Sequence, residues 1–173
     1  MAIAYELLVP DAILTALNTN SSDVNRIDNT IAGTDGVGLG YDGNGLVDVQ
    51  VSFPTPSGDL VGIQTFRFRA QKDSTGGQTP TAVVGLAEGG TDLSTSNSFS
   101  FNGDNVTVVD FNWNATLLSL QNGSGAEAFF TQDGGGASGN PNSRRGFNID
   151  EIEWVVQYET PPGFEAEANV VWV

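Results

Sequence analysis

Apolar and polar side chains alternate along most of the chain after Gly45, as they do in β-strands that bury one face. The segments that follow this alternation are residues 46–53, 62–72, 81–88, 97–101, 106–113, 126–132 and 146–160. Turn-forming residues separate them, and glycine alone occupies 22 positions. The pattern predicts an all-β fold of about eight to ten antiparallel strands in two packed sheets, and a β-sandwich of the jelly-roll type fits this count best.

Within the predicted strands, the larger apolar side chains fall on one face and define a core. In residues 146–160, for example, Trp154 and Val156 alternate with Glu153 and Gln157. The residues that the alternation assigns to the core most clearly are Val49, Phe66, Phe68, Phe111, Trp154 and Val156. A chain of 173 residues has the usual length of one domain and is long enough to bury such a core.

The N-terminal part of the chain is less regular. Residues 2–9 are apolar enough for a strand or a docking arm, and residues 11–17 are expected to form helical turns. Turn-forming residues dominate positions 18–45. We therefore interpret residues 1–45 as an irregular N-terminal arm with surface loops packed on the domain, and residues 46–173 as the β-sandwich. The two parts make up a single domain.

The chain contains no cysteine and no histidine. This excludes disulfides, thiol nucleophiles, ligation of zinc or haem by these residues, and catalysis that depends on a Ser-His or Cys-His pair. Carboxylate chemistry and calcium binding by oxygen ligands remain open. Because the sequence offers no other catalytic constellation, we expect a protein that is not an enzyme and uses no cofactor.

Acidic residues outnumber basic ones by 21 to 6, which gives a formal net charge of −15. A surface this negative repels phosphate backbones and anionic lipid head groups, so neither nucleic acid nor a membrane is an expected partner. We interpret the charge as a source of solubility, with docking onto a basic partner as the alternative. No apolar run approaches the ~20 residues that span a bilayer, and residues 1–10 lack the basic start of a secretory signal.

Residues 42–48 are similar to part of a calcium-binding loop. Asp42, Asn44 and Asp48 carry the hard oxygen ligands that calcium prefers, at alternating positions. No glutamate follows at the spacing that completes such a loop, and Asp-Gly and Asn-Gly pairs are common turn formers. An ordinary turn is therefore favoured over a metal site.

Glu151 and Glu153 form the densest carboxylate pair and lie about 7 Å apart along their predicted strand. That separation suits an inverting glycosidase. Both residues occupy the polar face of the strand, so we expect solvated surface charges and no acid with a raised pKa. Arg67 and Arg69 share the polar face of another strand and are expected to pair with these glutamates across neighbouring strands. A contact patch for an acidic partner is the alternative.

Both chain ends are unusually apolar, and a pair of arginines follows the glycine-rich residues 133–139. The residues predicted to contact a partner are Ile3, Tyr5, Leu7, Arg144, Arg145, Val171 and Trp172. The two arginines either close the glycine-rich loop or bind a partner. At least one apolar end is expected to pair with a neighbouring subunit by strand addition or groove docking. For residues 164–173, a last core strand is the alternative.

Several segments resemble structural proteins of tailed bacteriophages. These segments are Val9–Leu14, Val51–Gly58, Gln64–Arg67, Thr79–Ala82, Leu86–Gly90, Trp113–Leu118 and Glu153–Tyr158. Their order and spacing are similar over most of the chain, whereas residues 91–104 depart from the pattern and residues 1–45 match loosely. The segments are strands and turns without catalytic motifs. The resemblance therefore implies a β-sandwich displayed on a virus particle and assigns no functional residue.

From this resemblance we expect a non-enzymatic virion structural protein, with capsid decoration (a cement protein) preferred. The expected partners are other virion proteins, above all the major capsid protein, and further copies of the chain in a homo-oligomer. The expected location is the virion, after synthesis in the host cytoplasm.

Two alternatives to capsid decoration remain. One is a tail or baseplate component, and the other is a carbohydrate-binding module for host attachment. Such a module needs exposed aromatic rings, whereas Trp113, Trp154 and Tyr158 lie on apolar faces. A polysaccharide-cleaving enzyme has only the paired carboxylates in its favour.

Overall fold

The computed structural model describes residues 2–17, 19, 21–22, 24–27, 38–39, 46–72, 79–100, 106–134 and 146–160. The strands are β1 (Ala2–Leu8), β2 (Ala12–Leu17), β3 (Asp48–Ser52), β4 (Asp59–Leu60), β5 (Ile63–Lys72), β6 (Thr81–Glu88), β7 (Thr91–Thr95), β8 (Phe99–Ser100), β9 (Thr107–Asn114), β10 (Ala126–Gly134) and β11 (Phe147–Thr160). The helical segments of the described residues are the short 3-10 helices Val24–Arg26 and Ala115–Leu117. None of the helices in this part of the chain has the length and apolarity needed to cross a membrane.

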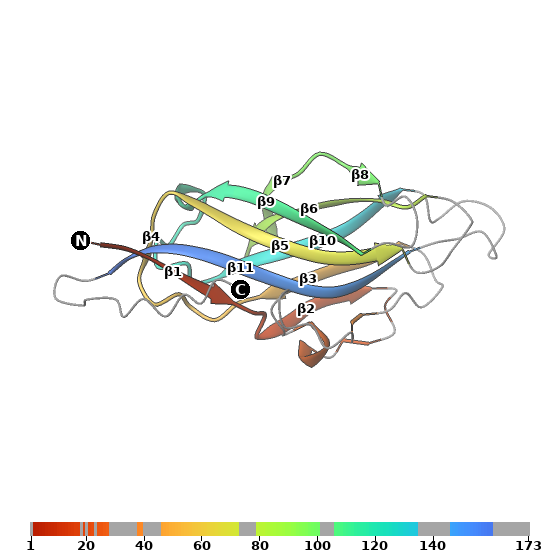
Figure 1. Cartoon of the computed structure of the whole chain (residues 1–173), viewed down its shortest axis with the longest axis horizontal. Helices are drawn as coiled ribbons and strands as arrows, with labels where there is room; N and C mark the ends of the chain where they lie inside the picture. Colours follow the sequence, from red (N-terminus) through yellow and green to blue (C-terminus); the bar gives the residue numbers. More distant parts are fainter. Residues whose placement is uncertain are drawn as a thin grey trace.

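The strands form two antiparallel sheets packed face to face (Figure 1). Sheet A has the order β1-β11-β5-β9, with β4 beside β11. Sheet B has the order β2-β3-β10-β6-β7, with β8 beside β6. Early strands pair with late ones, β1 with β11 and β3 with β10, which is the connectivity of a jelly roll. The predicted fold class, an antiparallel β-sandwich, is confirmed.

The core lies between the two sheets, where the apolar faces of the strands meet. All six residues predicted for it are buried, with at most 7% of their surface exposed. At one end, the rings of Phe53, Phe66, Trp113 and Trp154 pack with centroids 5.3–5.7 Å apart. Offset and edge-to-face packing of this kind adds to the stabilisation from burial alone. The alternation of the sequence therefore predicts both the strands and their inner faces.

A buried glutamine joins sheet A to this aromatic cluster. The side-chain oxygen of Gln64 accepts hydrogen bonds from the indole Nε1 of Trp154 at 3.3 Å and from the backbone N–H of Gln157 at 3.0 Å. Its amide nitrogen donates to the carbonyl oxygens of Val61 and Gln157. A buried amide with both ends satisfied avoids the desolvation penalty of an unpaired polar group.

The prediction of helical turns in residues 11–17 is wrong, because β2 spans Ala12–Leu17 and pairs with β3. A segment this short gains little from an isolated helix, since the first helical turn is costly to form. Pairing with β3 satisfies its backbone instead, and Ile13 packs against the core. The short strands β4 and β7 were also not expected from the sequence, because neither has a sustained apolar alternation.

Candidate functional site

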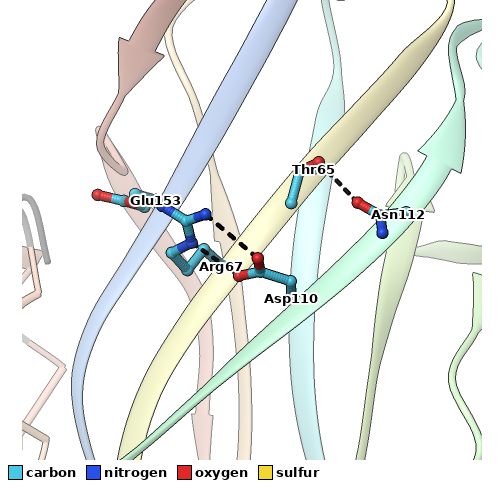
Figure 2. A network of polar contacts seen from close by, with 5 residues as sticks. All are labelled: Thr65, Arg67, Asp110, Asn112 and Glu153. Carbon is cyan, nitrogen blue, oxygen red and sulfur yellow. Dashed lines mark hydrogen bonds and ion pairs between the residues drawn. The ribbon is translucent and has the colours of Figure 1, made fainter. Parts of the chain in front are cut away.

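A row of charged side chains crosses three strands on the outer face of sheet A. Register places Arg67 on β5 between Glu153 on β11 and Asp110 on β9. The Nε of Arg67 lies 2.7 Å from Oδ1 of Asp110, and its NH1 lies 3.1 Å from Oε1 of Glu153. Figure 2 shows the guanidinium between the two carboxylates, with the hydrogen bond from Thr65 to Asn112 as a parallel rung. We call the charged residues of this row, together with Arg69 and Glu151, the ionic row.

Arg69 and Glu151 form the third ion pair of the ionic row. The NH1 of Arg69 lies 3.1 Å from Oε2 and 3.4 Å from Oε1 of Glu151. The predicted pairing of the two arginines with the two glutamates across neighbouring strands is therefore confirmed.

The expectation that Glu151 and Glu153 are solvated surface charges is wrong. Glu151 is 0% exposed and Glu153 is 2% exposed. On β11 both glutamates are paired with β5, where Arg69 lies opposite Glu151 and Arg67 opposite Glu153, whereas β1 extends only as far as Trp154. A carboxylate excluded from water in this way needs a positive partner, and the arginines of β5 supply it.

Asp150 lies at an irregularity of β11, where the register with β5 shifts between Ile149 and Glu151. Burial raises the pKa of its carboxyl above the ordinary value, Arg69 opposes this, and the neighbouring charge of Glu151 adds to it. On β5, the hydrogen bond to Asp110 is the largest cause that raises the pKa of Arg67.

This geometry does not suit glycoside hydrolysis by the two glutamates. An inverting glycosidase needs one carboxyl that protonates the leaving group and another that activates a water beside the sugar. Glu151 and Glu153 are closed off from solvent and bound to arginines. They hold the sheet together and do not present a reactive pair to a substrate.

The calcium hypothesis is tested only at Asp48. Its Oδ1 accepts a hydrogen bond from the Thr131 hydroxyl at 2.8 Å, across the pair of strands β3 and β10. Asp42 and Asn44 lie outside the described residues, so calcium binding there stays a prediction. Among the residues that the structure describes, no group of three or more carboxylates is arranged to hold a metal ion.

Other carboxylates of the described residues fasten loops to strands. Glu6 accepts hydrogen bonds from the backbone N–H and the hydroxyl of Ser57, both at 2.7 Å. Glu88 binds Ser119 in the same way. These acids have structural partners within the chain, which accounts for part of the acidic surface without a ligand.

The most unusual exposed surface lies on β1, at the edge of sheet A. Ile3, Tyr5 and Leu7 point to the outer face and are 57%, 58% and 46% exposed. We call these three residues the β1 row. On the other sheet, the end strand β2 exposes Leu14 and Leu17, at 49% and 57%. Leu17 lies opposite Asp48, next to the pair of Ala16 with the buried Val49, so it faces the outer side of sheet B.

Three of the predicted contact residues thus lie together on one exposed strand, the β1 row. Leu14 and Leu17 were missed because residues 11–17 were expected to be helical. The other predicted contact residues, Arg144, Arg145, Val171 and Trp172, lie outside the described residues.

The sequence and fold were compared with known proteins. No protein-family model and no curated protein matches the chain. One similar solved structure is an arabinose-bound α-L-arabinofuranosidase, MgGH51, with a TM-score of 0.46 and 15% identity over 65% of this chain. The chain spans only 17% of that enzyme.

A second similar structure is the CBM36-1 domain of a multidomain xylanase from the hindgut metagenome of Trinervitermes trinervoides. Its TM-score is 0.38 and its identity 17%, over 88% of this chain and 96% of the domain. At these identities and TM-scores, neither similarity assigns a function to this chain.

Proposed function

We propose that this protein is a non-enzymatic structural component of a tailed-bacteriophage virion, added to the capsid shell as a decoration protein. The observation that carries the proposal is the β1 row. A decoration protein acts through protein–protein contact, and an exposed apolar row is a surface of the kind that such contact requires. The sequence resemblance to virion structural proteins supplies the biological setting.

Single exposed apolar residues are common on soluble proteins and need no explanation. The β1 row differs because its three residues follow one another on the outer face of one end strand. Adjacent exposed apolar side chains are typical of interaction surfaces. In a chain with a net charge of −15, an uncharged exposed row is also the least repulsive place for another acidic protein to approach.

The ionic row supports a structural role for the charged residues. Its buried acids are bound to arginines of a neighbouring strand, and Asp110 binds the same arginine as Glu153. These contacts link β11, β5 and β9 into a stiff face. A domain with a cross-linked sheet and an exposed apolar end strand suits a protein that reinforces a capsid shell.

A carbohydrate-binding role receives less support from the aromatic residues. Trp113 and Trp154 are 3% and 0% exposed, and Tyr158 packs against the core. Among the described residues, Tyr5 is the aromatic side chain that is mostly exposed, and its neighbours in the row are the aliphatic Ile3 and Leu7. A sugar platform would more usually combine exposed rings with polar groups that bind hydroxyls.

The test is co-purification with virus particles. Particles from a lysate of the bacterium that carries the gene are banded by density, and the chain is quantified relative to the major capsid protein. We expect it to band with filled heads in a copy number of the same order as that capsid protein. Immunogold labelling that locates the chain on the tails would contradict capsid decoration and support the tail-component alternative. Recovery only at the top of the gradient, or binding to a glycan array in place of particles, would overturn the proposal.

A further inference from the structure

We propose that two copies of this chain associate through their β1 strands, which pair antiparallel about a twofold axis at Tyr5 and continue sheet A from one copy into the other. The inference rests on the proposed function for its biological reason, since a shell-binding protein gains avidity from a dimer. Its partner, a second copy of the chain, is specified by the geometry of β1 itself.

The outer edge of β1 is available for pairing. In the described part of the chain, β1 is an end strand of sheet A and is bonded to β11 on one side only. Its register with β11 runs without a shift from Ala2, opposite Thr160, to Leu8, opposite Trp154. Exposed edges are usually protected by bulges, prolines, lysines or inward charges. β1 has no bulge, proline or lysine, and its one inward-facing charge, Glu6, is bound by Ser57 of the same chain.

The other end strands of the two sheets have a register shift or carry polar side chains on the outer face. The register between β2 and β3 shifts between Ile13 and Thr15, and the register between β6 and β7 also shifts. The opposite edge of sheet A, β9, carries Asp110 and Asn112 on its outer face, both bonded to β5. The strand that is both regular and apolar on its exposed face is β1.

The β1 row is complementary to itself when two strands run antiparallel. With Tyr5 opposite Tyr5 of the second copy, Ile3 lies opposite Leu7 of that copy, and Leu7 opposite its Ile3. All seven residues of β1 are then paired. A shift of one residue would turn the row of one copy to the wrong face, and a shift of two would leave one of its three side chains unpaired. One register is therefore clearly preferred, and it has the self-complementary form of a twofold interface.

Charge favours the same location. Each copy carries a net charge of −15, so association is opposed at most surfaces. The single charged residue of β1 is Glu6, and its carboxylate is held by Ser57 of the same chain. Because apolar contact attracts while overall charge repels, added salt should strengthen the dimer, whereas an association held by ion pairs would weaken.

The expected affinity is modest. Seven paired residues bury less than the ~800 Å² per partner of a standard interface. We therefore expect a dissociation constant on the order of micromolar, with the dimer favoured where many copies are concentrated on one surface.

The absence of native cysteine permits a direct test by cross-linking. Directly opposed residues of antiparallel strands have Cα atoms about 4.5–5.5 Å apart, within the range that a disulfide bridges. The variant Tyr5→Cys of the full chain, oxidised with diamide, should therefore form a covalent dimer in high yield. The matched control is Val108→Cys on β9, 47% exposed on the outer face of the same sheet, which should remain a monomer.

A mixture of cysteine variants tests the register. Ile3→Cys and Leu7→Cys, oxidised together, should give the mixed dimer in preference to either homodimer. Sedimentation of the unmodified chain should show the dimer fraction rising with salt, and Tyr5→Asp should reduce it at least tenfold while Val108→Asp does not.

Several outcomes would overturn the inference. These are equal cross-linking of Tyr5→Cys and Val108→Cys, homodimers of Ile3→Cys as abundant as the mixed product, or an unmodified chain that stays monomeric at 100 µM-scale concentrations, roughly a hundred times the expected dissociation constant. If Tyr5→Asp does not fold, the cross-linking result decides. A monomeric chain that still bands with particles would contradict this inference and leave the proposed function intact. A dimer that is absent from particles would contradict the proposed function and leave this inference intact.

Discussion

On the outer face of sheet A, the β1 edge and the strands beside it stabilise the molecule in different ways. Across β11, β5 and β9, the ionic row satisfies its own charges, and Arg67 alone contacts carboxylates on both neighbouring strands. On β1, the side chains of Ile3, Tyr5 and Leu7 are about half exposed. Among the described residues, the first region pairs its charges internally, whereas the second leaves apolar side chains exposed.

This difference shows that residue polarity and exposure are separate properties in a sandwich. Glu151 is fully buried, whereas Tyr5 on the same face is more than half exposed. The two residues differ in their neighbours, because Glu151 lies opposite Arg69 of β5 and Tyr5 lies on an end strand. A buried charge is stable only with its partner, so the two regions should respond very differently to substitution.

The largest effect is expected for Arg69→Met. This change leaves the carboxylate of Glu151 buried without its ion-pair partner, and breaking a buried pair from one side lowers stability by about 3–5 kcal/mol. Urea denaturation should report the loss as a lower midpoint with an unchanged slope. The double variant Arg69→Met with Glu151→Met should recover most of it. A single-variant loss below about 1 kcal/mol would mean that Glu151 is not dependent on Arg69.

A much smaller effect is expected for Asp110→Asn at the exposed end of the same row. The side chain of Asp110 is 44% exposed, and water replaces it readily as a partner of Arg67. Exposed ion pairs contribute about 0.2–1 kcal/mol, so the substitution should lower the free energy of unfolding by an amount in that range. The difference from the unmodified chain should become smaller in high salt. A loss of stability as large as that of Arg69→Met would contradict the expectation that the exposed ion pair contributes less than the buried one.

The sequence predicts the inner faces of the strands better than the outer ones. Alternation assigns Phe66, Phe68 and Trp154 to the core, because any sandwich must bury the apolar face of each strand. It also predicts that the arginines and glutamates share the outer face and pair. It does not predict the burial of Glu151, because alternation within one strand carries no information on the order of strands in the sheet.

The N-terminal elements show the same limitation. The alternation of the β1 row predicts a strand, but whether Tyr5 is exposed depends on β1 being an end strand. For β2, short length and a register shift near Leu14 obscured the pattern, and pairing with β3 decided its structure. Long-range pairing, which local sequence does not encode, explains both cases.

A pH dependence of stability is expected from Asp150, which lies next to the ionic row. Burial, opposed by Arg69 and assisted by Glu151, raises the pKa of Asp150 above its ordinary value of 3.8. The folded chain therefore binds this proton more tightly than the unfolded chain. The stabilisation is complete below pH 3.8 and is lost as the pH rises through the raised pKa.

Asp150→Asn removes this titration. Compared with the unmodified chain, the variant should be slightly more stable at neutral pH, and its advantage should decrease as the pH falls toward 3.8. Urea denaturation of both chains across that range measures the difference and cancels the titration of the other carboxylates. An advantage that grows toward acid pH would contradict the direction of the shift.

The smallest effect on stability is expected on the β1 row, where Tyr5→Thr and Leu7→Thr should change the free energy of unfolding by no more than about 0.5 kcal/mol. Threonine suits a strand as well as the residues that it replaces, and the pairing of β1 with β11 uses backbone groups that the change leaves in place. The measurement is made at low protein concentration, where the monomer predominates. In concentrated solution the same variants should lose self-association, because the apolar area at the twofold axis is gone. A row that is dispensable for folding and necessary for association is an interface, whereas a loss of stability comparable to that of Arg69→Met would make β1 a part of the core that merely happens to be exposed.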